Sequence, residues 1–154
     1  MKKVAVAAVV VLALVLFVSG SREPVTITLA AEDAELITDG ALVLEGDADA
    51  GYNVGWWETI NDEVSWDVEV ESAGGYTVSI YYSCDPQFPG STVAVSAGNE
   101  MVEGTIRDTS AWDSYITQEL GTIQLEAGMQ TITIRATSVA NRFVCNLRRI
   151  VLEK

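Results

Sequence analysis

The stretch Ser65-Trp66-Asp67-Val68-Glu69-Val70-Glu71 alternates polar and apolar side chains. Successive side chains of a strand point to opposite faces of its sheet, so this period of two predicts a half-buried strand with Trp66 facing a core. Gly74-Gly75 follows as a turn signal, and a second alternating run occupies Tyr76–Ser83. In that run Tyr76 and every second residue after it share one apolar face. These two runs predict two strands that are joined by a turn.

The same alternation recurs along the chain between turn-forming residues. Further predicted strands are Val25–Ala30, Ala41–Leu44, Thr92–Ser96, Met101–Ile106, Gln118–Leu125, Gln130–Ala136 and Cys145–Leu152. Glycine, proline and aspartate punctuate the gaps between them, as turns require. No segment after residue 21 has a sustained helical period. Many short strands without intervening helices predict an all-β fold, a two-sheet antiparallel β-sandwich of the jelly-roll type.

The first 21 residues have the order of a secretory signal peptide. Lys2 and Lys3 precede the apolar run Val4–Val18, and small residues follow at positions 19–21. A membrane-spanning helix needs about 20 apolar residues, so an uncleaved anchor is the less favoured alternative. We therefore expect a secreted protein with a signal peptide at 1–21 and a single domain at 22–154.

The chain is strongly acidic, with 22 acidic and 9 basic residues and a formal net charge of −13. Such a surface repels phosphate backbones and anionic lipids. Nucleic acid is therefore excluded as a partner, and so is a membrane once the signal peptide is cleaved. We interpret the charge as an aid to solubility in an extracellular medium.

The composition argues against an enzyme. Without histidine, the chain has no Ser–His or Cys–His nucleophile pair and no ordinary zinc site. Asp47, Asp49 and Glu58 approach the spacing of a calcium-binding loop, but Tyr52 stands where that loop requires glycine. Facing carboxylates of a glycosidase leave no sequence signature, so a small secreted hydrolase stays as an alternative. We expect a non-catalytic domain that needs no cofactor.

Cys84 and Cys145 lie at the ends of two predicted strands. In an exported protein a disulfide between neighbouring strands is compatible with this placement. Two buried free thiols are the alternative.

Two stretches place aromatic residues among small and polar ones. Gly51–Trp57 resembles a loop before a strand, and Asp108–Tyr115 contains both Trp112 and Tyr115. Sugar rings present apolar C–H faces and peripheral hydroxyls, so flat aromatic rings beside amides or carboxylates suit them. A core position is the competing interpretation. It is as well supported as binding for Trp57, whereas the polar surroundings of Trp112 favour binding.

Several short motifs follow one another in a characteristic order. They are Ala31-Glu32-Asp33-Ala34, Asp62–Val68 with Gly74–Val78, Asp108–Trp112, Leu125–Gly128 and Cys145-Asn146-Leu147. Together they resemble carbohydrate-binding modules of families 6 and 35, galactose-binding-like β-sandwiches that accompany secreted glycosidases and sulfatases. The resemblance implies one sugar site at the loop edge of the sandwich. It places Trp112 and Asn146 in that site, with Tyr52 or Trp57 as a second aromatic platform.

The resemblance also implies a structural calcium ion, bound by the residue at Glu32 and by an aspartate shortly after Asn146. Here Arg148 occupies the position of that aspartate. A cation there repels calcium and replaces its charge, so we expect a Glu32–Arg148 ion pair in place of the metal. A second departure is Ser110, where the family usually has glycine.

The sequence therefore predicts a secreted carbohydrate-binding module whose partner is a poly- or oligosaccharide. The alternative is an extracellular β-sandwich that binds another secreted protein or has a structural role without binding sugar, since fold does not fix function.

Overall fold

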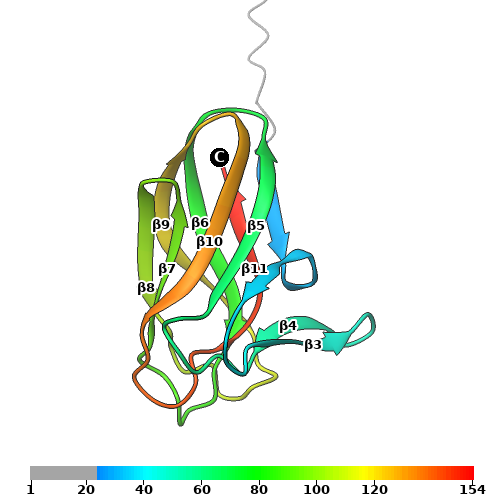
Figure 1. The fold of residues 1–154 in the computed structure, drawn as a ribbon, viewed down its shortest axis with the longest axis vertical. Helices are drawn as coiled ribbons and strands as arrows, with labels where there is room; N and C mark the ends of the chain where they lie inside the picture. The colour runs from blue at the N-terminus through cyan, green and yellow to red at the C-terminus, as the bar shows by residue number, and fades with distance from the viewer. Residues whose placement is uncertain (1–23) are drawn as a thin grey trace, which may run out of the picture.

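The computed structural model describes residues 24–154 of the chain (Figure 1). The predicted signal peptide lies outside these residues. The elements in chain order are β1 (Thr26–Ala30), the 3-10 helix η1 (Ala31–Asp33), β2 (Glu35–Ile37), β3 (Val43–Asp47), β4 (Gly51–Gly55), β5 (Glu63–Val70), β6 (Gly74–Ser83), β7 (Thr92–Ala97), β8 (Glu100–Thr105), β9 (Ile116–Leu125), β10 (Gly128–Ser138) and β11 (Asn146–Glu153). All the predicted strands are present, with ends that differ by a few residues.

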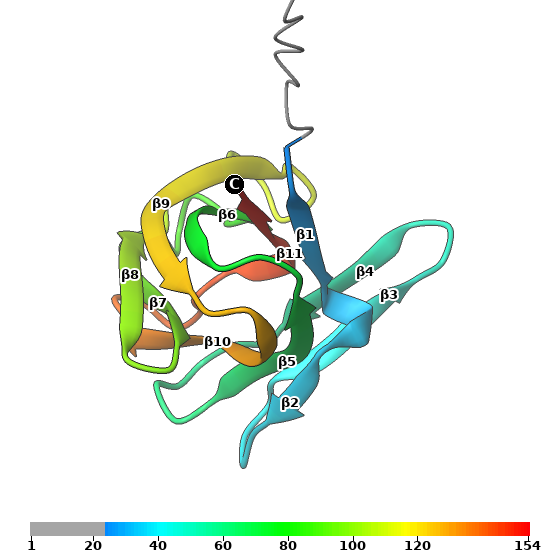
Figure 2. The same ribbon diagram turned by 90° about the horizontal axis from the view of Figure 1, so that it is seen from above.

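The strands form two antiparallel sheets that pack face to face (Figures 1 and 2). One sheet has the order β3-β4-β11-β6-β9, and β1 also pairs with β11. The other has the order β2-β5-β10-β7-β8. The predicted all-β, two-sheet antiparallel sandwich is therefore confirmed.

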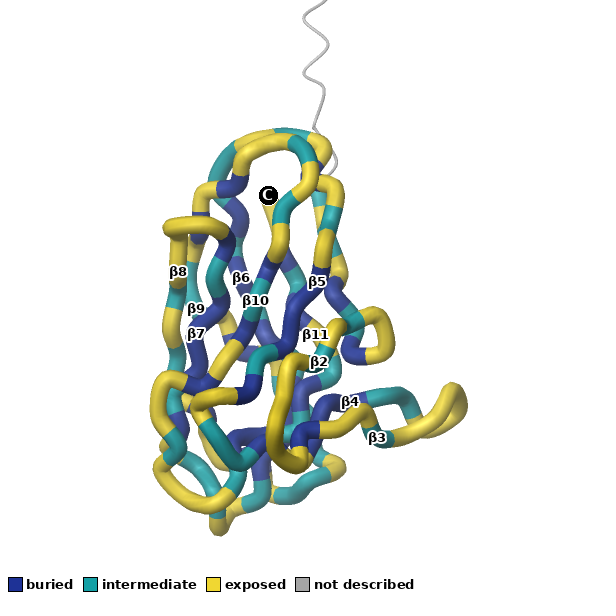
Figure 3. The backbone as a smooth tube through the Cα atoms, in the orientation of Figure 1, coloured by how far each residue is buried: buried dark blue, intermediate teal, exposed yellow. Residues whose placement is uncertain are grey.

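The core lies between the two sheets, on the faces that the alternation predicts. Tyr76, Val78, Ile80 and Tyr82 of β6 are all fully buried. Buried segments in Figure 3 follow the central strands, whereas turns and strand ends are exposed. Because one face of each strand meets the other sheet, the period of two in the sequence translates directly into packing.

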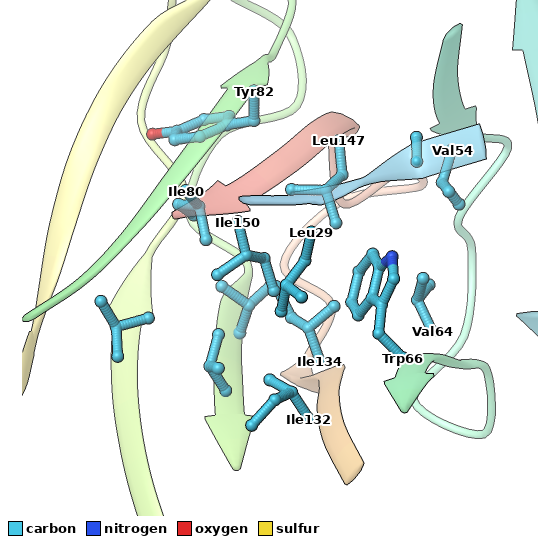
Figure 4. Packing of buried hydrophobic residues seen from close by; sticks show 14 of the residues in the cluster. Leu29, Val54, Val64, Trp66, Ile80, Tyr82, Ile132, Ile134, Leu147 and Ile150 are labelled. Carbon is cyan, nitrogen blue, oxygen red and sulfur yellow. The ribbon is translucent and has the colours of Figure 1, made fainter. Parts of the chain in front are cut away.

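Trp66 of β5 is part of this core and is 5% exposed. Its register partner on β10 is Ile132, and in Figure 4 its indole lies among buried aliphatic side chains. The indole Nε1 donates a hydrogen bond of 2.7 Å to the carbonyl oxygen of Ala30. The one polar atom of the ring is thus satisfied inside the core, as is usual for a buried tryptophan.

Residues Gly51–Gly55 form strand β4, so their interpretation as a loop is wrong. They pair with β3 along its whole length, from Val43 opposite Gly55 to Asp47 opposite Gly51. The resulting hairpin projects sideways from the two-layer body (Figures 1 and 2). Glycine and asparagine have low strand propensity, which hides this strand from a pattern search. The short strand Glu35–Ile37 was also not predicted. None of the helices within residues 24–154 is long and apolar enough to cross a membrane.

Candidate functional site

A hollow of about 250 Å³ lies at the loop edge of the sandwich, at the base of the β3–β4 hairpin. Its lining residues come from segments distant in sequence and are Glu45, Trp56, Trp112, Phe143, Cys145 and Asn146. Glu45 belongs to β3, Trp56 follows β4, and Asn146 begins β11. Trp112 lies between β8 and β9, and Phe143 lies between β10 and β11. The hairpin and two long loops therefore build one site.

Three of the six lining residues are aromatic, and a fourth ring, that of Phe88, packs against two of them. Phe143 contacts Trp56 edge to face, with ring centroids 5.8 Å apart, and Trp112 in the same way at 6.1 Å. Phe88 stacks on Trp112 at 5.6 Å and meets Phe143 edge to face at 5.1 Å. Edge-to-face and offset contacts are the favourable arrangements of aromatic pairs. The four rings hold one another in place, so the wall is preorganised.

The loop that carries Trp112 is tied to the end of β6. The hydroxyl of Thr109 accepts a hydrogen bond from the backbone N–H of Cys84 at 2.8 Å. The hydroxyl of Ser83 donates to the carbonyl oxygen of Trp112 at 2.6 Å. Ser110 has a positive φ of 80°, and its N–H donates to Asp108 Oδ1 at 2.6 Å. Serine thus adopts the left-handed conformation that glycine usually supplies, with an aspartate cap to stabilise it.

Trp56 and Trp57 point in opposite directions. Trp57 is fully buried, and its carbonyl oxygen accepts a hydrogen bond of 2.8 Å from the N–H of Val144. Trp56 is 49% exposed and has a φ of 55°, a rare value for a bulky residue. Because Trp57 is anchored in the core and Trp56 has a left-handed backbone, the ring of Trp56 faces the hollow. The prediction of Trp57 as an aromatic platform is therefore wrong, because Trp57 belongs to the core.

Two polar groups complete the wall. Glu45 accepts hydrogen bonds from Trp56 Nε1 at 2.7 Å and from Asn53 Nδ2 at 3.2 Å. The side-chain amide of Asn146 makes no hydrogen bond to any residue in the described part of the chain. A Cβ added at Gly55 would lie 2.2 Å from Glu45 Oε2 and 3.0 Å from Asn146 Oδ1. Glycine at position 55 thus leaves free the space that the carboxylate and the amide oxygen both border.

The structure brings together only part of the predicted site. Trp112 and Asn146 line the same hollow, as predicted. Tyr52 is partly buried against the core and is not a lining residue. Glu45, Trp56 and Phe143 line the hollow but were not predicted. Strand alternation gave no signal for Trp56, because a left-handed residue that lies after the end of β4 sets the direction of its side chain.

Tyr115 lies behind the hollow rather than in its wall. Its hydroxyl donates a long hydrogen bond of 3.4 Å to Asn53 Oδ1, and Asn53 in turn holds Glu45. The guanidinium of Arg148 lies 4.0 Å from the centre of the Tyr115 ring, within cation–π range. A continuous chain of contacts therefore runs from Arg148 through Tyr115 and Asn53 to Glu45 and then to Trp56.

The predicted Glu32–Arg148 ion pair is wrong. Glu32 is exposed in η1, while Arg148 Nη2 donates to the carbonyl oxygen of Ala50 at 2.8 Å. Gly51 permits this approach, because a Cβ there would lie 3.3 Å from the Arg148 guanidinium carbon. Within residues 24–154 no three aspartate, glutamate, cysteine or histidine residues gather closely enough to hold a metal.

Cys84 and Cys145 are both free and buried, so the alternative to the predicted disulfide is the one observed. Cys84 comes directly after Ser83 and Cys145 directly before Asn146, and Ser83 and Asn146 are register partners on β6 and β11. The thiol of Cys84 donates to the carbonyl oxygen of Asp85 at an S–O distance of 3.6 Å, while Cys145 lines the hollow. Burial raises the pKa of Cys84 to about 11 and raises the pKa of Cys145 as well. Both thiols are therefore protonated at neutral pH, which makes them poor nucleophiles.

The fold of this chain is similar to that of carbohydrate-binding modules in solved structures. A family 35 carbohydrate-binding module from Clostridium thermocellum superposes with a TM-score of 0.68 and 18% identity, over 83% of this chain and 97% of that one. The C-terminal family 6 module of the laminarinase LamC from Zobellia galactanivorans gives 0.68 and 19%, over 84% and 99%. A module of lichenase 5A from Cellvibrio mixtus, in complex with cellotriose, gives 0.64 and 23%, over 83% and 96%.

In sequence, the chain is 29% identical over 89 residues to an isomaltosyltransferase from Sporosarcina globispora. That match covers 55% of this chain but 8% of the transferase, so the chain spans only a small part of that protein. No protein-family model matches the sequence. The structural likeness covers most of the chain: residues 24–154 have the fold of carbohydrate-binding modules of families 35 and 6.

Proposed function

We propose that this domain binds carbohydrate, with one sugar ring in the hollow at the loop edge. The observation that carries the proposal is the convergence of two tryptophans, a carboxylate and an unengaged amide on that one hollow. These groups are Trp56, Trp112, Glu45 and Asn146. The C–H face of a sugar ring packs on indole, and its hydroxyls hydrogen-bond with the amide and the carboxylate.

The dimensions of the hollow suit a small part of a glycan. At about 250 Å³ it is smaller than the roughly 300–1,000 Å³ typical of pockets that enclose whole ligands. A single ring fits this size, and the rest of the chain would remain in solvent. Few hydroxyls are then enclosed, so each site binds weakly, as expected where little surface is buried.

The proposed role is non-catalytic. Glycosidases need two carboxyl groups across the scissile bond, about 5–10 Å apart. Of the six residues that line the hollow, Glu45 alone carries a carboxyl group. The thiol of Cys145, also in the wall, is not activated, since burial raises its pKa.

The comparisons support a role beside glycan-active enzymes. The solved structures include modules of a laminarinase and a lichenase, an exo-β-1,3-galactanase with galactose, and a cycloalternan-forming enzyme with a pentasaccharide substrate. The proposed function is thus to hold an enzyme or a cell surface against a glycan. Export through the signal peptide at 1–21 is part of this proposal. Another secreted protein is a further proposed partner.

Affinity gel electrophoresis of the purified protein in neutral polysaccharides, including laminarin, lichenan and galactan, tests the proposal. Retardation by at least one polysaccharide is expected, and it should be lost in Trp112→Ala. Met129→Ala is the matched control, because Met129 is exposed on β10 and outside the hollow. If no glycan retards the unaltered protein, or Trp112→Ala binds normally, the sugar site is excluded. The alternative function, that of a structural or protein-interaction domain, would then be favoured.

A further inference from the structure

The wall of the hollow carries a negative charge that cannot swing away. The carboxylate of Glu45 accepts hydrogen bonds from two N–H donors, Trp56 Nε1 at 2.7 Å and Asn53 Nδ2 at 3.2 Å. Its neighbour Asn53 is buried and also accepts a long hydrogen bond of 3.4 Å from the hydroxyl of Tyr115. A carboxylate offers about four lone-pair sites, so two remain for a ligand. The charge is therefore a fixed part of the site.

No basic residue in the described part of the chain forms an ion pair with this carboxylate. The only ion pair within residues 24–154 joins Arg142 to Glu58, with an N–O distance of 2.9 Å. Arg148, at the far end of the same contact chain, is engaged by the Tyr115 ring and the carbonyl oxygen of Ala50. The hollow itself is lined by no lysine or arginine. The whole chain, with Glu45 included, has a formal net charge of −13.

We infer that the hollow selects neutral sugars and rejects acidic ones, with Glu45 as the residue that sets this specificity. The inference rests on the proposed function and names the substrate class of the same site. A sugar carboxylate or sulfate that enters the hollow comes within a few ångströms of Glu45. Like charges at that separation repel strongly where water is partly excluded. We expect the affinity for a uronic acid to be at least about tenfold lower than that for its neutral parent.

The same wall favours a pair of adjacent hydroxyl groups. Glu45 Oε2 and Asn146 Oδ1 both lie next to the space above Gly55. One sugar hydroxyl can donate to the carboxylate while its neighbour exchanges hydrogen bonds with the amide. Hydrogen bonds to a charged acceptor are roughly twice as strong as neutral ones, so the carboxylate that repels anions also favours hydroxyl donors.

A ligand series tests the inference without altering the protein. Binding is measured by NMR titration for methyl glucoside, methyl glucuronoside and the methyl ester of that uronoside, and for the corresponding galactose series. In the series that binds, the neutral sugar and the ester are expected to bind alike, and the uronoside at least about tenfold more weakly. Raising the salt concentration should narrow the difference. If the ester binds as weakly as the uronoside, shape rather than charge is responsible and the inference is overturned.

Glu45→Gln assigns the effect to one residue. It keeps the shape of the side chain and removes its charge, so the ratio of neutral to acidic affinity should fall several-fold. Glu126→Gln is the matched control: Glu126 is exposed in the turn between β9 and β10, outside the hollow, and its loss changes the net charge equally. Glutamine cannot accept from both N–H donors, so the ratio is compared rather than either affinity alone. An unchanged ratio in Glu45→Gln overturns the inference.

The two proposals fail separately. If the unaltered protein binds no sugar in either series and no polysaccharide, the proposed function fails. If it binds neutral and acidic sugars equally well, the proposed function stands and the inference about Glu45 is wrong.

Discussion

Trp66 in the core and Trp56 at the rim of the hollow are placed by different features of the chain. Both indole N–H groups are satisfied at 2.7 Å, one by the carbonyl oxygen of Ala30 and the other by the carboxylate of Glu45. Trp66 is 5% exposed and lies on a regular strand, whereas Trp56 is 49% exposed and has a left-handed backbone. The core thus follows from regular alternation, and the rim follows from a local break in it.

The largest expected effect comes from the core. Trp66→Ala removes a buried ring that the surrounding strands cannot replace, and should lower the free energy of unfolding by about 3–5 kcal/mol. Urea unfolding followed by circular dichroism measures this change. Sugar affinity per folded molecule should be unchanged, because Trp66 does not line the hollow. A loss below about 1 kcal/mol would mean that the two sheets are less tightly packed around this ring than described.

A smaller effect, on sugar affinity, is expected at Gly55, where the β3–β4 hairpin meets the hollow. In Gly55→Ala the added Cβ would lie 2.2 Å from Glu45 Oε2 and 3.0 Å from Asn146 Oδ1, so both polar groups must move. We expect sugar affinity to fall by roughly tenfold or more, since hydrogen bonds to charged groups contribute about 1.5–3 kcal/mol. Isothermal titration with the best-bound polysaccharide measures the loss. Gly98→Ala is the control. A Cβ at Gly98 meets open space, so alanine there strains only its own backbone, which has a positive φ of 56°, and leaves the hollow unchanged.

The contrast with the core is sharpest at Trp56. Trp56→Gly removes the aromatic wall but relieves a left-handed backbone conformation that costs a bulky residue about 1–3 kcal/mol. Glycine also loses more conformational freedom on folding, by about 0.5–1 kcal/mol. We expect the free energy of unfolding to change by less than about 1 kcal/mol, while sugar affinity falls by about tenfold. A destabilisation as large as that of Trp66→Ala would contradict the division between core and rim.

The same contrast explains what the sequence could predict. Regular alternation in β5 and β6 revealed the sheets, and short motifs pointed to Trp112 and Asn146. Strand β4 was not predicted because its glycines have low strand propensity. They are needed for close contacts instead: Gly51 leaves room for Arg148, and Gly55 leaves room for Glu45 and Asn146.

Long-range contacts were the second obstacle. Glu45 reaches the site only because the β3–β4 pairing brings it beside Asn53 and Trp56. The partner of Arg148 proved to be an aromatic ring and a carbonyl oxygen rather than a carboxylate. No local pattern encodes such a choice, because cation–π contacts and carbonyl hydrogen bonds leave no periodicity.

The smallest effect on stability and on sugar affinity is expected at Tyr115, which does not line the hollow. Tyr115→Phe removes the 3.4 Å hydrogen bond to Asn53 but keeps the ring against Arg148 and Tyr81. A bond this long is weak, so the free energy of unfolding should fall by less than about 0.5–1 kcal/mol. Sugar affinity should fall by no more than a few-fold, because Asn53 still donates to Glu45. Tyr115→Ala, which also removes the ring, should have the larger effect on affinity. If the two variants bind equally well, the stacked ring does not help to position Glu45, and the rim is held by the hairpin pairing alone.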